Sequence, residues 1–226
     1  MRLDRFICKS TNYTRVEAKE LIDSGRVTVN HVTDIHEAYQ VHENNEITLD
    51  GMSLSLRPSR YIMLHKPAGF LSSNADGRYP SLFNLLDIAD VDNLHLAGRL
   101  DRDTTGLVLI TDDGRWTFNL ISPDKNCEKR YRVGLRNDIT SEAITALESG
   151  LKINGFTHMT KPAKVEVVHS KEVLLTITEG KYHQVKRMFQ ALNNKVVKLH
   201  RESIGKIELN IPEGEWRYLA ESEVAL

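Results

Sequence analysis

The chain has 226 residues, of which 40% are hydrophobic and 27% charged, and its formal net charge is −1. This composition is typical of a soluble globular protein with one large domain or two smaller ones. No stretch approaches the roughly 18 consecutive apolar residues of a membrane helix, which excludes a membrane-spanning class.

Cysteine usage and the N-terminus indicate the compartment. Cys8 and Cys127 lie far apart and match no metal-ligand spacing, so we expect reduced thiols rather than a disulfide framework. Residues 1–5 lack the apolar core of a signal peptide. The nine histidines show no metal spacing either. We therefore expect a cytoplasmic protein without a metal site.

Charge is distributed unevenly along the chain. Residues 1–26 hold six basic and four acidic residues, whereas 27–56 hold five acidic residues and no basic one. Residues 125–136 hold five basic residues and one acidic, and 179–206 hold seven and two. Basic blocks are the footprint of phosphate contacts, although any single block is as often a solvated face. The basic blocks favour a nucleic-acid partner, which the net charge of −1 alone would not suggest.

Two short helices are expected near the N-terminus. Leu3, Phe6 and Ile7 have helical spacing. Thr14 and Glu17 form a capping-box pattern, in which the hydroxyl and the carboxylate each satisfy a free backbone group. The apolar residues of the second helix and the glycine that ends it are Val16, Leu21, Ile22 and Gly25. Short strands are expected over 26–30 and 46–51.

Residues 1–56 resemble the S4 RNA-binding domain. The resemblance lies in the strings RLDRFI and GRVTVN and in the Thr-Arg-x-x-Ala-x-x-x-Ile pattern between them. It implies that the two helices present basic residues to structured RNA. Carried over by position, the candidate RNA contacts are Arg2, Arg5, Arg15, Lys19 and Arg26. Residues 57–60 are expected to form a linker.

A second domain is expected over 61–226, beginning with an apolar strand at 61–64. Strands outnumber helices and many links are short, which favours an α+β fold with a mostly antiparallel sheet, flanking helices and a central cleft. Further strands are expected at 107–111, 129–135, 163–168, 173–178 and 196–200. Helices are expected near 115–121, 140–148 and 181–193.

The segment 98–111 is the most informative part of the sequence. A loop rich in charges and hydroxyls, reading GRLDRDTT, runs directly into the apolar strand GLVLIT. A stiff strand end can hold the carboxylate of Asp101 at a fixed point. From physical chemistry alone, an aspartate at this place is more often a turn or cap residue than a catalytic one.

GRLD followed by DTTGL resembles the active-site motif of the RNA pseudouridine synthases, in the branch that modifies ribosomal RNA. The resemblance implies that Asp101 is the catalytic carboxylate and that Arg99 helps to hold a flipped nucleotide. Arg102 is a further candidate for RNA contact. The neighbours expected to support the loop are Asp103, Thr104 and Thr105.

A second motif follows at Lys129-Arg130-Tyr131-Arg132-Val133. The period of a strand places Tyr131 on one face and both Arg130 and Arg132 on the other. One interpretation is a core tyrosine with arginines in solvent. The K-x-Y string resembles the family's second signature, which implies that Tyr131 stacks on the uracil. Arg130 and Arg132 are then candidate RNA contacts.

The third motif, residues 179–189, predicts an amphipathic helix. On a helical wheel Lys186 borders the apolar face and Arg187 points away from it. Cations in the first turns of a helix are repelled by the positive end of its dipole. Their presence here indicates that an anion, either a carboxylate or a phosphate, binds beside them. The family resemblance implies that a basic residue here pairs with Asp101, and both wheel and motif favour Lys186 over Arg187. His183 is expected as an RNA contact or helix cap, and Arg187 is expected to face RNA or solvent.

Two shorter strings complete the resemblance. Lys66-Pro67-Ala68-Gly69 resembles the family's first motif, a turn near the cleft, and Lys66 is counted among the candidate RNA contacts. The run 196–201 resembles the last motif, which implies that Leu199 packs against the base pocket.

The resemblance covers essentially the whole chain and is strongest to the branch acting on the small ribosomal subunit. It implies isomerisation of one uridine in 16S ribosomal RNA, uridine 516, after base flipping and without a cofactor. Asp101 then attacks C1′ or C6, or removes the C2′ proton. The expected partner is ribosomal RNA in a small-subunit assembly intermediate, and the expected state is a monomer.

Two other functions remain open at this point. One is a pseudouridine synthase acting on 23S ribosomal RNA. The other is a non-catalytic S4-type RNA-binding or ribosome assembly factor, against which the intact Asp101, Tyr131 and Lys186 argue. A carboxylate hydrolase is a weaker alternative, because no second acid stands in a matching motif.

Overall fold

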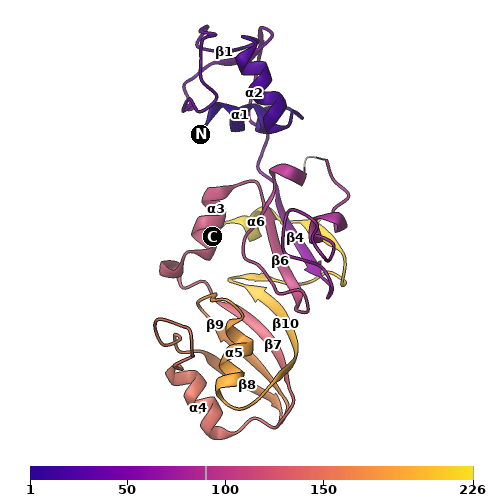
Figure 1. The fold of residues 1–226 in the computed structure, drawn as a ribbon, viewed down its shortest axis with the longest axis vertical. Coiled ribbons are helices and arrows are strands. Elements are labelled where there is room, and N and C mark those ends of the chain that lie inside the picture. Colours follow the sequence, from indigo (N-terminus) through magenta and orange to yellow (C-terminus); the bar gives the residue numbers. More distant parts are fainter. Residues whose placement is uncertain (90, 226) are drawn as a thin grey trace. The chain divides into compact units, whose positions relative to one another are not determined.

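The computed structural model describes residues 1–89 and 91–225 and divides into two compact units (Figure 1). The first unit comprises Met1–Ser59 together with Ile88–Leu94. The second comprises Arg60–Asp87 and the chain from His95 onward.

The first unit packs two helices on a small antiparallel sheet. Its helices are α1 (Leu3–Ser10) and α2 (Arg15–Asp23), and its strands are β1 (Val27–Val29), β2 (Ile47–Leu49) and β3 (Met52–Ser53). The strands pair in the order β1-β2-β3. Leu3 and Ile7 of α1 meet Leu21 and Ile22 of α2 in a shared core. The helical spacing read from the sequence therefore marks the buried faces of both helices.

The predicted capping box fixes the start of α2. The Thr14 hydroxyl accepts the backbone N–H of Glu17 at 3.3 Å, and the Glu17 carboxylate accepts the N–H of Thr14 at 2.7 Å. Two backbone donors are thereby satisfied at the helix N-terminus, which confirms the prediction.

The second unit is built on a nine-stranded sheet. Seven strands run in the order β12-β4-β6-β10-β7-β9-β8, while β11 pairs with β10 and β5 with β6. Every pairing is antiparallel except β6 with β10, so the mostly antiparallel α+β fold is confirmed and the sheet is mixed. The strands are β4 (Tyr61–Lys66), β5 (His95–Leu96), β6 (Thr105–Thr111), β7 (Lys129–Leu135), β8 (Lys164–His169), β9 (Glu172–Ile177), β10 (Val196–Ile204), β11 (Ile207–Glu208) and β12 (Trp216–Tyr218).

Helices flank this sheet. Helix α5 lies against β10 and α4 against β8, as Figure 1 shows. The helices are α3 (Gly114–Ile121), α4 (Ser141–Ser149), α5 (Gln184–Ala191) and α6 (Glu221–Val224), with short 3₁₀ turns at Leu82–Leu85, Val91–Asn93 and Pro123–Lys125. The sequence predicted neither the 3₁₀ turns nor α6, β3, β5, β11 and β12, because segments this short carry too few periodic positions.

Helix α5 is shorter than the predicted span 181–193. His183 precedes it in the left-handed conformation, with a φ of 51°. A residue in that conformation cannot continue a right-handed helix, so residues 181–183 form a turn. The difference matters because this turn carries His183 toward the site described below.

The parallel pair β6–β10 requires a glycine at position 106. Gly106 has a φ of +110°, and a Cβ there would lie 2.3 Å from the backbone oxygen of Arg201. Only glycine permits so close an approach of the two backbones. The glycine of the DTTGL string is therefore a packing requirement of the sheet beside the candidate site.

Among the described residues, no helix is both long and apolar enough to cross a bilayer.

Candidate active site

Asp101 lies in the loop between β5 and β6, and its carboxylate contacts two side chains of the third motif, a lysine and a histidine. Lys186 Nζ lies 2.9 Å from Oδ2, and His183 Nε2 lies 3.2 Å from Oδ1. The carboxylate is partly buried, with 26% of the side chain exposed. Lys186 and His183 come from α5 and the turn before it, so two distant motifs converge on one carboxylate.

Lys186 also contacts a second carboxylate of the same loop, Asp103, at 2.6 Å. Burial disfavours the ammonium, but hydrogen bonds to Asp103 and Asp101 outweigh it, and the pKa of Lys186 is raised. The lysine therefore stays charged between two acids. The predicted contact of Lys186 with Asp101 is present, which is the arrangement that the helical wheel favoured.

Arg187 was expected to face RNA or solvent, and its side chain is only partly exposed. Its guanidinium lies 4.3 Å from the ring centroid of Phe156 and donates a hydrogen bond to the carbonyl of Asn154. Arg187, which points away from the apolar face of α5, therefore contacts the loop that contains Asn154 and Phe156. This tertiary contact could not be read from the helix alone.

Lys66 was expected among the RNA contacts, and the structure shows that this is wrong. The side chain is completely buried at the end of β4. Its ammonium donates to the backbone carbonyls of Asp101, Arg102 and Thr104 at 2.9–3.2 Å, and to that of Pro67 at 3.0 Å. Burial lowers the pKa of Lys66 to about 8. Lys66 is therefore a brace for the Asp101 loop and has no surface to offer to RNA.

A pocket of about 270 Å³ opens beside Asp101. Tyr131 and Leu199 line it from the adjacent strands β7 and β10, and both are less than a tenth exposed. Because the register pairs Tyr131 with Arg201 across these strands, the apolar wall of the pocket is one face of the sheet. The structure thus brings Tyr131, Leu199, Asp101 and Lys186 to one cavity.

Arg201 and Lys129 also line the pocket, although neither residue was assigned a role from the sequence. Arg201 is 2% exposed, and its Nε donates to the Leu107 carbonyl at 2.8 Å. Lys129 is 8% exposed on β7. The two-residue period of a strand predicts that both side chains face the pocket, because Arg201 is two positions after Leu199 and Lys129 is two positions before Tyr131.

The remaining candidate contacts of this unit take different positions. Arg99 is exposed and lines the pocket, whereas the exposed Arg102 lies 4.3 Å from the ring centroid of Tyr79. Arg130 and Arg132 lie on the opposite face of β7 from Tyr131, as predicted, and both bind Glu202. The two arginines are therefore outside this pocket.

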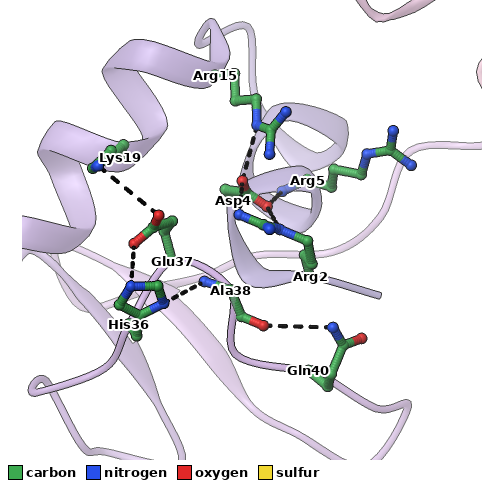
Figure 2. A network of polar contacts seen from close by, with 9 residues as sticks. All are labelled: Arg2, Asp4, Arg5, Arg15, Lys19, His36, Glu37, Ala38 and Gln40. Carbon is green, nitrogen blue, oxygen red and sulfur yellow. Dashed lines mark hydrogen bonds and ion pairs between the residues drawn. The ribbon is translucent and has the colours of Figure 1, made fainter.

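Two arginines of the first unit, Arg2 and Arg15, bind a buried acid, Asp4, as Figure 2 shows. Asp4 is 1% exposed and accepts hydrogen bonds from Arg2 at 3.1 and 2.9 Å and from Arg15 at 3.0 Å. Burial favours the neutral acid, but these hydrogen bonds outweigh it and the pKa of Asp4 is lowered. The carboxylate thus orients two arginines whose side chains stay 36% and 62% exposed.

The other three candidate contacts of the first unit are exposed as well. The side chain of Arg5 extends away from the Asp4 network in Figure 2. Lys19 lies 3.9 Å from Glu37, and Arg26 forms a bidentate pair with Asp50. All five predicted basic residues are therefore at least partly accessible, four of them in ion pairs.

Comparison with known proteins agrees with this geometry. Residues 60–191 match the family model described as RNA pseudouridylate synthase, and residues 1–47 match the S4 domain. Since the first of these models covers more than half of the chain, the protein belongs to the RNA pseudouridylate synthase family, with an S4 domain at its N-terminus.

Relatives that align with essentially the whole chain are named as pseudouridine synthases of the small ribosomal subunit. "Ribosomal small subunit pseudouridine synthase A" of Vibrio cholerae serotype O1 is 48% identical over 227 residues, covering 100% of this chain and 98% of the relative. The protein of the same name from Escherichia coli K12 is 42% identical over 228 residues, covering 100% and 99%. A crystal structure of a pseudouridylate synthase is 42% identical, covers 99% and 98%, and has a TM-score of 0.73.

Proposed function

We propose that this enzyme converts uridine 516 of 16S ribosomal RNA to pseudouridine and that Asp101 is its catalytic carboxylate. The observation that carries the proposal is the contact of Lys186 with Asp101 at 2.9 Å, at the edge of a pocket walled by Tyr131. The substrate follows from full-length similarity to enzymes named for the small ribosomal subunit.

The reaction breaks the N1–C1′ bond and joins C5 to C1′, with no net change in atoms or electrons. Asp101 acts either by attack on C1′ or C6 or by removing the C2′ proton, and each route needs an ionised carboxylate. The adjacent Lys186 favours that form, because a nearby opposite charge stabilises a carboxylate. Lys66 fixes the backbone carbonyl of Asp101, which keeps the reacting group in place.

The pocket is suited to one extruded base. Its volume, about 270 Å³, is slightly below the roughly 300–1,000 Å³ of pockets for drug-sized ligands. A target inside a folded RNA must leave its stack to enter it. Tyr131 supplies an aromatic surface for the uracil, and such stacking contributes about 1–3 kcal/mol per base. Leu199 closes the apolar side of the pocket.

The S4 domain supplies binding affinity for ribosomal RNA in this proposal. Arg2, Arg5 and Arg15 are exposed or partly exposed on the helical side of the first unit. Arginine binds phosphates through a planar fork of donors, which positions an RNA backbone without reading its sequence. We place the substrate in a small-subunit assembly intermediate, where the target uridine is still accessible.

Mapping of pseudouridine in both ribosomal RNAs tests the proposal. A deletion strain is complemented with the wild-type gene or with Asp101→Asn, which keeps the shape of the side chain. We expect loss of pseudouridine at position 516 on deletion, restoration by wild type, and none by Asp101→Asn. Modification lost from 23S ribosomal RNA instead would assign the large-subunit function. Unchanged modification in both RNAs would indicate a non-catalytic RNA-binding factor.

A further inference from the structure

Two buried cationic side chains, those of Arg201 and Lys129, line the Asp101 pocket. Arg201 is 2% exposed on β10, directly opposite Tyr131 of β7 in the strand register. Lys129 is 8% exposed and lies two residues before Tyr131, on the same face of β7. Both residues line the pocket. A guanidinium and an ammonium therefore flank the tyrosine against which the uracil is proposed to stack.

Within residues 1–89 and 91–225, no carboxylate forms an ion pair with Arg201 or Lys129. The two carboxylates that line the same pocket are matched by other lysines, Asp101 by Lys186 at 2.9 Å and Glu179 by Lys181 at 3.0 Å. The pocket thus carries an excess of positive charge before a substrate enters.

The hydrogen bonds of the two cations are also incomplete. Arg201 donates through Nη1 to the Tyr131 hydroxyl at 3.4 Å, while its buried Nη2 has no hydrogen-bond partner among the described residues. Lys129 Nζ donates to the Cys127 carbonyl at 3.0 Å. Burial lowers the pKa of Lys129, which reflects the cost of holding this charge away from water.

Such an arrangement costs stability. A buried charge without a partner is expensive, and replacing it with an apolar side chain is often neutral or stabilising. Uncompensated charges therefore concentrate where a reaction uses them. An anion that enters the pocket would offset the charge of Arg201 and Lys129.

The isomerisation supplies that anion in each route open to Asp101. Attack on C1′, or removal of the C2′ proton, expels the uracil with the electron pair of the N1–C1′ bond. Attack on C6 pushes electrons through C5 onto O4. The charge is cancelled when C5 bonds to C1′, while the bond from Asp101 to C1′ or C6 breaks or, in the third route, Asp101 returns the proton to C2′. The C5 proton then leaves and N1 takes up a proton. In every case the ring that enters the pocket is transiently negative.

We infer that Arg201, assisted by Lys129, stabilises the negative charge that the uracil ring takes up during the isomerisation. The inference rests on the proposed function of Asp101. Fixed charges in a water-poor pocket stabilise a developing charge effectively, because they need no reorganisation as it forms. A phosphate bound in the same place would instead be stabilised equally before and during the reaction, which affects binding rather than rate.

Single-turnover kinetics with 16S ribosomal RNA distinguish these cases. Arg201→Gln keeps a hydrogen-bond donor and removes the charge, whereas Arg201→Lys keeps the charge. We expect Arg201→Gln to slow the rate constant at saturating RNA by about 10²- to 10³-fold, the effect typical of losing one preorganised donor. We expect Arg201→Lys to recover at least tenfold of that loss, with RNA affinity within about threefold of wild type in both.

The controls separate charge from structure. Tyr131→Phe removes the hydroxyl that Arg201 contacts, and a role limited to holding Tyr131 predicts the same loss for this variant and no recovery by lysine. Arg217→Met removes an arginine of the same unit outside the pocket and should leave the rate unchanged. Thermal unfolding reports whether each variant folds. If both Arg201 variants unfold, Lys129→Gln provides the test, with an expected loss of about tenfold.

Three results overturn the inference. They are an unchanged rate for Arg201→Gln, equal rates for the lysine and glutamine variants, or a loss confined to RNA affinity, which would assign the cations to a phosphate. Wild type and Asp101→Asn are measured in parallel on the same RNA. Lack of product from wild type would overturn the proposed function itself, whereas product from wild type with an unaffected Arg201→Gln overturns only the role of Arg201.

Discussion

The buried ammonium of Lys66 donates to the backbone carbonyl of Asp101 at 3.2 Å, so the last residue of β4 fixes the loop that carries the candidate catalytic carboxylate. The same ammonium contacts the carbonyls of Arg102 and Thr104. Asp101 is therefore held from two directions. Its backbone is bound to Lys66, and its carboxylate is bound to Lys186 of α5.

Removal of Lys66 should destabilise the second unit. Lys66→Met removes the ammonium that binds four backbone carbonyls, and those of Pro67 and Thr104 lose the donor that it supplies. We expect this change to lower the free energy of unfolding by about 2–4 kcal/mol. Urea denaturation followed by tryptophan fluorescence measures the change, since Trp116 and Trp216 both belong to this unit. Lys164→Met, which removes an exposed lysine, should cost less than about 1 kcal/mol. Equal stability of the two variants would contradict the bracing role.

Lys186 and Arg187 should differ sharply although they are neighbours. Lys186→Met leaves the partly buried Asp101 carboxylate without its ammonium partner, and we expect single-turnover pseudouridine formation to fall by about 10²- to 10³-fold with little change in RNA affinity. Arg187→Met removes contacts with the loop at 154–156, so its rate should stay within about tenfold of wild type. A larger loss for Arg187→Met than for Lys186→Met would reverse these roles.

Asp4 should support RNA binding although it is acidic. Asp4→Asn removes a negative charge, which by itself would tighten RNA binding, but it also releases Arg2 and Arg15 from their common acceptor. We expect affinity for 16S ribosomal RNA to fall by about 3- to 10-fold and the salt slope to shrink by about 1–2, because phosphate contacts are lost. Asp34→Asn makes the same charge change at an exposed site of the first unit. Tighter binding by both variants would show that Asp4 positions nothing.

The pair between Arg217 and Glu223 should produce acid sensitivity. The hydrogen bond from Arg217 lowers the pKa of Glu223 from 4.5 to about 2. A carboxylate with a lowered pKa stabilises the fold fully above its ordinary pKa and loses that contribution as pH falls from 4.5 toward 2. Glu223→Gln should therefore cost about 1–3 kcal/mol at pH 7. Urea unfolding at pH 7, 4 and 3 should show this difference closing, and a constant difference would refute the linkage.

Local sequence determined much of this protein. The capping box of α2, the apolar stripe of α5 and the alternation along β7 each depend on residues within one or two turns, so their spacing predicted them. The same local reasoning selected Lys186 over Arg187 as the partner of Asp101. The family resemblance pointed to Asp101 and Tyr131, and the structure brings both residues to one pocket.

Tertiary structure decided what local spacing could not. Lys66 acts on a carbonyl 35 residues further along the chain, and Arg201 contacts a hydroxyl 70 residues before it. Sequence alone suggested an RNA contact for Lys66 and no role for Arg201, because a cation's environment depends on which strands become neighbours. The antiparallel pairing of β4 with β6 and of β7 with β10 makes those neighbours. A lysine at a strand end is a surface charge or a buried brace according to which backbone carbonyls the sheet brings within reach of its ammonium.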